Sequence, residues 1–322
     1  MSSGRLKKHT FSCGNRFFSA VILSFSLMLL WGSSALKSQP PGSLTFVRKF
    51  TGADSHGGRF QNASAMDLDT EGSVYIVDRG RNRLLKFDPK GVFIREIGGF
   101  GQGSEQFDDI RDVDASSTLD IYLADFNNDR IVRLNQRLEF LNSYKTNPDA
   151  ENGFEQPLSI AVSPQNDLFI LENVDKRILK LNRFTEVVQI FGGLTATLGQ
   201  LLEPVQIALD ENLRIFVSDP GQRAVLVYDY LGNFVQSLLH PQMVRPAGIA
   251  VGADGNLYVT EKKNKMVLIF NPKLKFRTLL KMPAALPGIQ DVALSYDKRT
   301  GRRTLYVLAP TECWIFNLKL EQ

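Results

Sequence analysis

The chain has 322 residues, of which 43% are hydrophobic, and it carries 38 Lys and Arg against 34 Asp and Glu. Four of the basic residues lie in the first 35 positions, which contain no acid, so the rest of the chain is balanced at 34 against 34. The formal net charge of +4 therefore belongs to the N-terminal segment, and composition argues against a basic nucleic-acid-binding surface.

The first 35 residues have the layout of a secretory signal peptide. A basic segment (1–16) precedes a 15-residue apolar stretch (17–31), and Ser33 and Ala35 are small residues suited to the cleavage site. The alternatives are an uncleaved anchor, although a bilayer span takes about 20 apolar residues, and a mitochondrial presequence, although these are amphipathic. We expect an extracytoplasmic protein, secreted or periplasmic, in which a linker (36–43) follows the signal; an uncleaved segment would instead anchor it to the membrane, facing outside.

The two cysteines offer no intrachain disulfide to the mature protein. Cys13 belongs to the predicted signal, which leaves Cys313 alone.

A repeat follows the linker and fills the rest of the chain. Its six copies align on one aromatic residue at spacings of 47, 47, 47, 42 and 48: Tyr75, Tyr122, Phe169, Phe216, Tyr258 and Tyr306. Short apolar runs alternate with turn clusters too closely for a helix to fit between them, so each copy predicts strands. The first copy predicts four strands, at 65–69, 73–77, 83–87 and 92–97. Six such units predict an all-β fold, a six-bladed β-propeller of four-stranded blades.

The two ends of the repeat region complement each other. The first strand-like run, LTFVRKF (44–50), resembles a fourth strand without the preceding three, whereas the last unit has three strands and lacks its fourth. We expect the N-terminal strand to pair in the last blade, which closes the ring and covers an exposed sheet edge.

Three stretches give the repeat its family resemblance: GFGQGSEQF (99–107), RPAGIAVGADGNLYVTE (245–261) and YIVDRGRNRLLKF (75–87). Together they resemble the NHL repeat, over residues 44–320. The resemblance implies a six-bladed propeller. It leaves function open, because relatives with this fold bind RNA, sense extracellular ligands, scaffold protein partners or catalyse metal-dependent lyase and hydrolase reactions.

An acid and a base recur in every copy but the last. The acid follows the second strand, as Asp78, Asp125, Glu172, Asp219 and Glu261. The base enters the third strand, as Arg83, Arg130, Arg177, Arg223 and Lys265. Five copies of one active site are hard to explain, whereas an acid that accepts backbone N–H bonds and pairs with the base would hold each loop in place. We interpret both as structural.

Function is expected where the copies differ, near the start of the innermost strand. The first variable position, here called the first channel position, is occupied by Ala65, Asp112, Ser159, Gln206, Gly248 and Asp291. Two residues later, the second channel position is occupied by Asp67, Asp114, Ala161, Ala208, Ala250 and Ala293. The candidate ligand-binding residues are Asp67, Asp112, Asp114, Ser159, Gln206 and Asp291. Since the last blade neighbours the first, the four Asp residues should share one side of the channel.

Clustered carboxylates suit Ca²⁺, which takes 6 to 8 oxygen ligands. The predicted calcium ligands are Asp67, Asp112, Asp291 and Gln206. The alternative is that Arg111 and other bases neutralise the carboxylates, or that they face a water-filled channel. Zinc chemistry is disfavoured because the histidines, His9, His56 and His240, are scattered in the sequence.

The function predicted from sequence is that of an exported, monomeric, non-enzymatic binding or scaffold protein without a cofactor. A propeller face or channel mouth would bind a protein, peptide or glycan, and nucleic acid is not expected as a partner. The alternative is an enzyme of the calcium-dependent lactonase or esterase type. His56 is a further candidate, as a general base, although no GxSxG motif accompanies it.

Overall fold

The computed structural model describes residues 42–320 except 118, 148–149, 151 and 185. All of them belong to one of the two units into which the chain divides, Ser38–Gln322. The predicted signal peptide and nearly all of the linker lie outside the described residues. Among the residues that are described, no helix is both long and apolar enough to cross a membrane.

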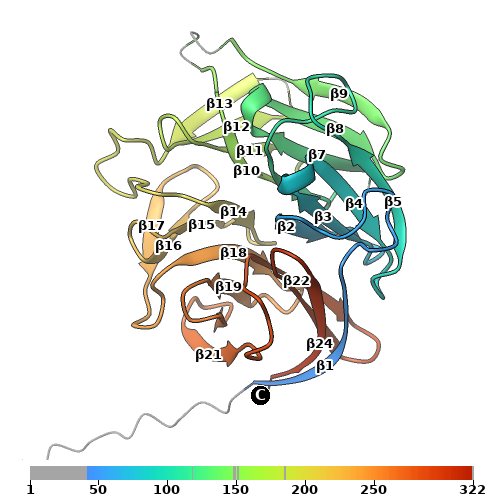
Figure 1. Cartoon of the computed structure of the whole chain (residues 1–322). Coiled ribbons are helices and arrows are strands. Elements are labelled where there is room, and N and C mark those ends of the chain that lie inside the picture. The colour runs from blue at the N-terminus through green and yellow to red at the C-terminus, as the bar shows by residue number, and fades with distance from the viewer. Residues whose placement is uncertain (1–41, 118, 148–149, 151, 185, 321–322) are drawn as a thin grey trace, which may run out of the picture. The chain divides into compact units, whose positions relative to one another are not determined.

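The strands form six four-stranded antiparallel sheets arranged around a central axis (Figure 1). The innermost strand of each sheet is β2 (Ala63–Leu68), β6 (Ile110–Asp114), β10 (Pro157–Val162), β14 (Gln206–Leu209), β18 (Pro246–Val251) or β22 (Asp291–Asp297). The second strand is β3 (Val74–Asp78), β7 (Asp120–Asp125), β11 (Leu168–Glu172), β15 (Ile215–Asp219), β19 (Leu257–Glu261) or β23 (Arg302–Leu308). Neighbouring innermost strands contact one another around the ring, including β22 with β2.

The outer half of each sheet repeats in the same way. The third strand is β4 (Arg83–Phe87), β8 (Arg130–Asn135), β12 (Ile178–Asn182), β16 (Ala224–Tyr228), β20 (Met266–Phe270) or β24 (Cys313–Lys319). The outermost strand is β5 (Phe93–Gly98), β9 (Phe140–Tyr144), β13 (Glu186–Phe191), β17 (Phe234–Leu238), β21 (Phe276–Lys281) or, in the last sheet, β1 (Ser43–Phe50). Short 3₁₀ turns, η1 (Arg79–Arg81) and η2 (Phe126–Asn128), follow β3 and β7.

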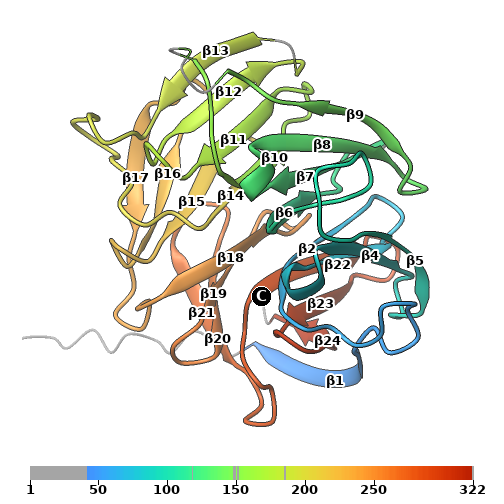
Figure 2. The ribbon, with the colours of Figure 1, turned by 45° about the horizontal axis from the view of Figure 1, so that its top comes forward.

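Ring closure is made by the two ends of the repeat region, as Figure 2 shows for β1 beside β24. The two strands pair antiparallel from Ser43 opposite Lys319 to Phe50 opposite Cys313. An ion pair of 2.8 Å between Lys49 Nζ and Glu312 Oε2 strengthens the junction. The chain is a six-bladed β-propeller, and the predicted fold and closure are confirmed.

The burial of the strands explains why the sequence reads as continuous apolar runs. Strands β3, β7, β11, β15 and β19 are buried at every residue, because each lies between two partner strands and is covered on both faces by the adjacent blades. The outermost strands are only partly buried, as β5 and β17 illustrate. The core clusters accordingly span adjacent blades: Tyr75 and Val77 of the first blade pack with Val113 and Leu123 of the second.

The recurrent acids hold the loops beside the innermost strands. Asp78 accepts hydrogen bonds from the backbone N–H groups of Gln61 and Asn62, at 3.0 and 2.9 Å. Asp125, Asp219 and Glu261 accept equivalent backbone bonds in their own blades, whereas Glu172 accepts from Val174 and Asp175 in the loop that follows it.

The recurrent bases differ more between blades than the sequence suggested. Arg83, Arg130 and Arg177 pair with the acid of their own blade. Lys265 instead donates to the Leu286 carbonyl oxygen, and Arg223 is exposed. The expectation that all five bases pair with the acid is wrong for these two. In the fourth blade, the amide of Gln222 lies 3.3 Å from Asp219 and replaces the base.

Candidate functional site

The two channel positions lie on the innermost strands, which surround the axis. Three polar residues at the first channel position accept a backbone N–H from the next blade. Asp112 Oδ2 accepts from Ile160 (3.1 Å), Ser159 Oγ from Ile207 (3.1 Å), and Gln206 Oε1 from Ile249 (2.7 Å). Asp291 Oδ2 makes the same bond to Met66 (2.8 Å), across the junction between the last blade and the first. These side chains therefore clamp adjacent blades together.

The second channel position supplies two more clamps. Asp67 Oδ2 accepts from the N–H of Ala115 (2.8 Å), which joins the first blade to the second, where Ala65 offers no acceptor. Asp114 Oδ2 accepts from the N–H of Val162 (2.7 Å), while its Oδ1 accepts from the backbone and hydroxyl of Ser116. Because buried backbone N–H groups need partners, these carboxylates have a structural function.

One junction lacks such a clamp, between the fifth and sixth blades, where Gly248 and Ala250 have no acceptor. Here the Thr260 hydroxyl accepts from the N–H of Gly248 (2.7 Å) and donates to the carbonyl of Gln290 (3.3 Å). The missing side chain of Gly248 also lets Asp291 approach, since a Cβ there would lie 2.2 Å from Asp291 Oδ1.

Gln206 crosses the channel and links blades that are not neighbours. Its Nε2 lies 3.2 Å from Asp291 Oδ2 and 3.4 Å from Asp112 Oδ1. These three side chains form a polar bar across the axis, here called the channel bar.

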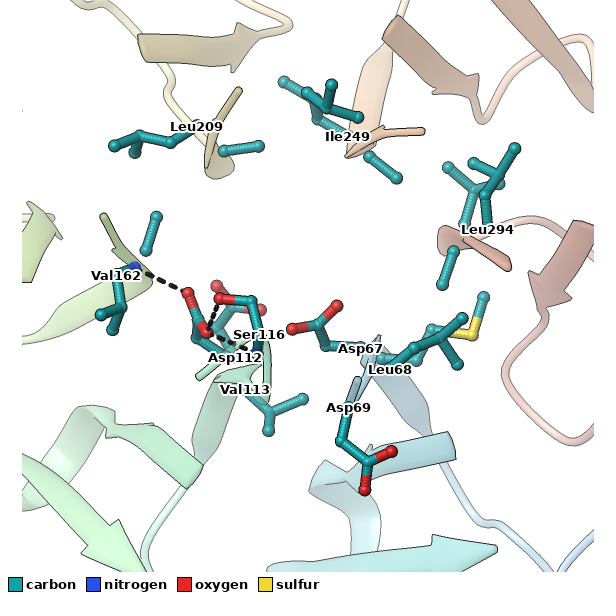
Figure 3. A pocket seen from close by; sticks show the side chains of 18 of the residues that line it. Asp67, Leu68, Asp69, Asp112, Val113, Ser116, Val162, Leu209, Ile249 and Leu294 are labelled. Atoms are coloured by element: carbon teal, nitrogen blue, oxygen red, sulfur yellow. Dashed lines mark hydrogen bonds between the residues drawn. The ribbon is translucent and has the colours of Figure 1, made fainter. Parts of the chain in front are cut away.

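A cavity of about 390 Å³ extends from the channel bar toward the ends of the innermost strands. We call it the channel pocket. Its lining includes the aliphatic side chains of Leu209, Ile249 and Leu294 and the carboxylate of Asp67 (Figure 3), and most of the surface that it presents to the cavity is polar. Asp114 also lines the channel pocket, and Tyr296 is the single aromatic residue among the described residues of the lining. The channel pocket is therefore amphipathic, with carboxylates and aliphatic side chains in the same lining.

Burial raises the pKa values of the carboxyl groups in the channel. It raises the pKa of Asp112 to about 7, with a further contribution from the charge of Asp291, while hydrogen bonds from Ser159 and Ile160 oppose the rise. Burial likewise raises the pKa of Asp291 to about 6. The pKa of Asp67 is raised well above its usual value by burial and then by the charge of Asp114. Protons are thus retained in the channel at pH values where ordinary carboxyls are ionised.

The predicted calcium ligands do not fit a calcium ion in this arrangement. Backbone N–H groups engage both oxygens of Asp291 and one oxygen each of Asp112 and Asp67, and Gln206 turns its amide N–H, not its oxygen, toward the carboxylates. Within the described part of the chain, no group of three or more His, Cys, Asp or Glu side chains could hold a metal ion. The calcium hypothesis stays a prediction without support from the geometry.

Arg111, predicted to neutralise the channel carboxylates, contacts a different acid. Its Nε donates to Asp109 Oδ2 at 2.7 Å, and its guanidinium lies 3.9 Å from the ring centre of Phe126. Sequence reasoning also missed Thr260 and the cross-channel reach of Gln206. The clamps left a signal in the sequence, because Asp112, Ser159 and Gln206 each accept from a residue about one repeat (43 to 48 positions) further on.

Comparison with known proteins supports the fold. A family described as a 6-bladed beta-propeller matches residues 65–182, and no curated protein matches the chain. Among solved structures, a streptogramin B lyase is 15% identical with a TM-score of 0.58, covering 87% of this chain and 97% of its own.

Two further structures are of virginiamycin B lyase from Staphylococcus aureus. The first, a selenomethionine form, is 14% identical with a TM-score of 0.58 and covers 87% of this chain and 100% of its own. The second, a catalytically inactive variant with quinupristin, has the same identity and TM-score and covers 86% and 100%. At such identities the likeness shows the fold alone.

Proposed function

We propose that this protein is an exported binding module whose channel pocket receives a basic side chain, such as lysine, from a protein or peptide partner. The observation that carries the proposal is the amphipathic lining of the channel pocket. A lysine side chain combines four methylene groups with an ammonium group, which match the aliphatic side chains and the carboxylates of the lining respectively.

The size and chemistry of the channel pocket favour a peptide over a glycan. A volume of about 390 Å³ is at the lower end of the range of small-ligand pockets, roughly 300 to 1,000 Å³, and suits one long side chain. Carbohydrates are commonly held against aromatic faces, and Tyr296 alone offers one among the described lining residues. Burying four methylenes contributes about 3 kcal/mol before the ammonium group is considered.

Asp67 is suited to receive the ammonium group, because it keeps its backbone bond through Oδ2 and is partly exposed to the channel. Both oxygens of Asp114 already accept hydrogen bonds, so Asp114 contributes through its charge. Because burial and Asp114 raise the pKa of Asp67, an entering cation would lower that pKa again and release a proton.

Export and the NHL type of the repeat belong to the same proposal. The basic, then apolar, then small-residue order of positions 1–35 supports export. The three stretches at 75–87, 99–107 and 245–261 support an NHL-type repeat.

The test is selection from a random peptide display library on the immobilised protein. We expect the enriched peptides to share a lysine and to lose binding by at least about tenfold (about 1.4 kcal/mol) in Ala208→Leu, which fills the channel pocket. Asp67→Asn retains an acceptor for Ala115 and should also weaken binding. The matched control, Gln236→Leu on exposed β17 of the same blade, should bind as the wild type. Enriched peptides that lack a basic residue, or that bind Ala208→Leu equally well, would contradict the proposal.

A further inference from the structure

Four cationic side chains lie at the end of the channel opposite to the channel pocket. Arg111 lies at the start of β6, one residue before the first channel position, and Arg245 directly precedes the first residue of β18. Arg79 and Lys262 directly follow the loop acids Asp78 and Glu261. The pairing of Ala63 with Asp78, and of Pro246 with Glu261, brings those residues to the same end. We call this group of four the cationic mouth.

Carboxylates neutralise the cationic mouth only in part. Asp109 is shared between two arginines: Arg79 donates to Oδ1 (2.6 Å) and Arg111 to Oδ2 (2.7 Å). Both arginines use Nε and Nη2 for this contact, which leaves the Nη1 groups free to bind another acceptor. Among the described residues, the side chains of Arg245 and Lys262 make no hydrogen bond or ion pair. The set therefore contains four positive charges and one shared carboxylate.

The cations act on one another across the channel. The pKa of Lys262 is lowered by burial and then by the charges of Arg245 and Arg79, against a raising effect of Asp291. The pKa of Arg111 is lowered by burial and then by the charge of Arg79. Charges that repel one another in a partly buried place are unfavourable unless an anion joins them.

Nearby acids are already engaged or lie on other blades. Asp291 accepts from Met66, Val292 and Gln206, and Asp108 is bonded to the amide of Asn127 (2.9 Å). Glu203 is exposed on the fourth blade, where none of the four cations lies.

We propose that the cationic mouth binds a compact anion with at least two negative charges and several acceptor oxygens, such as a phosphate or a di- or tricarboxylate. Arginine presents paired donors that match planar carboxylates and tetrahedral phosphates, and lysine adds a point charge. The channel bar closes the space beneath the anion, because Gln206 spans the axis with its amide and oxygen both engaged. This site is independent of the peptide proposed for the channel pocket, which lies on the other side of the bar.

The test is isothermal titration of the protein with inorganic phosphate and, separately, with citrate, at low ionic strength. We expect saturable binding of one or both, and the stronger ligand distinguishes a phosphate site from a carboxylate site. Lys262→Gln should weaken binding by at least about tenfold (about 1.4 kcal/mol). Lys263→Gln is the matched control, because it removes the same charge from the next, exposed residue and should change affinity less than about twofold.

Two results would overturn the inference. One is an absence of saturable binding of both anions up to about 10 mM, which corresponds to a standard free energy weaker than about −2.7 kcal/mol. The other is an equal loss of affinity in Lys262→Gln and Lys263→Gln, which would show diffuse attraction to surface charge. Ala208→Leu should bind both anions as the wild type does, so failure of the peptide proposal leaves this measurement unaffected.

Discussion

Replacing Gly248 with alanine tests the packing of the junction that lacks a side-chain clamp. A Cβ at this position would lie 2.2 Å from Oδ1 and 2.5 Å from Cα of Asp291, whereas ordinary contacts of a Cβ begin near 3.4 Å. Since the Cα belongs to the backbone, β18 and β22 must separate by roughly 1 Å. Overpacking of this kind costs about 1–3 kcal/mol.

The same displacement weakens a clamp at the next junction. Asp291 Oδ2 accepts from Met66 at 2.8 Å, and a hydrogen bond to a charged group contributes about 1.5–3 kcal/mol. We expect Gly248→Ala to lower the free energy of unfolding by about 3 kcal/mol in total, measured by urea denaturation followed by the fluorescence of Trp314. Gly288→Ala is the control, because its nearest contact is Pro310 Cδ at 3.4 Å, and it should change stability by less than about 1 kcal/mol. A Gly248→Ala protein as stable as this control would refute the close approach of β18 and β22.

Three further predictions concern the channel and the loops. The pKa values of Asp112 (about 7) and Asp291 (about 6) lie above those of the unfolded chain, so their protonated forms stabilise the fold at about pH 4 and this contribution is lost as pH rises through 6 to 7. Urea denaturation across this range should show the decline in the free energy of unfolding, and Asp112→Asn should make the decline shallower. An unchanged slope in Asp112→Asn would contradict the raised pKa of Asp112. Arg83→Met removes a buried partner of Asp78 and Glu96 and should lower the free energy of unfolding by about 3–5 kcal/mol. Arg223→Met, at the equivalent exposed position, should lower it by less than about 0.5 kcal/mol. Equal effects of the two variants in urea denaturation would argue against the ion pairs of Arg83. Millimolar Ca²⁺ or EDTA should leave the melting temperature unchanged, and a rise of several degrees with Ca²⁺ would restore the calcium hypothesis.

The architecture was predictable because the same pattern of strands and turns recurs in six copies. Six copies in register fix the strands, and the unmatched strand at each end fixes the closure through β1 and β24. The predicted start of the first innermost strand, at 65, is two residues late because Ala63 still pairs with Asp78 beyond a bulge.

The candidate site was only partly predictable because it depends on contacts between copies. The sequence placed Asp112, Gln206 and Asp291 near the axis, but it could not show that Gln206 reaches across the channel to both carboxylates. The cationic mouth could not be predicted because its four side chains come from three blades and are far apart in the sequence. The residue after the loop acid differs between blades and is basic in the first and fifth, as Arg79 and Lys262. These charges indicate a binding site only once the ring brings the blades together.

The channel pocket contains its own reporters, because the alanines of the second channel position line it: Ala161, Ala208, Ala250 and Ala293. Methyl NMR of alanine-labelled protein, titrated with n-pentylamine and separately with pentanoate, tests the proposed function most directly. The account predicts that the ammonium compound shifts these methyl signals saturably, that pentanoate does not, and that Ala208→Leu abolishes the effect. Equal binding of the two compounds, or shifts confined to alanines outside the channel pocket, would contradict it.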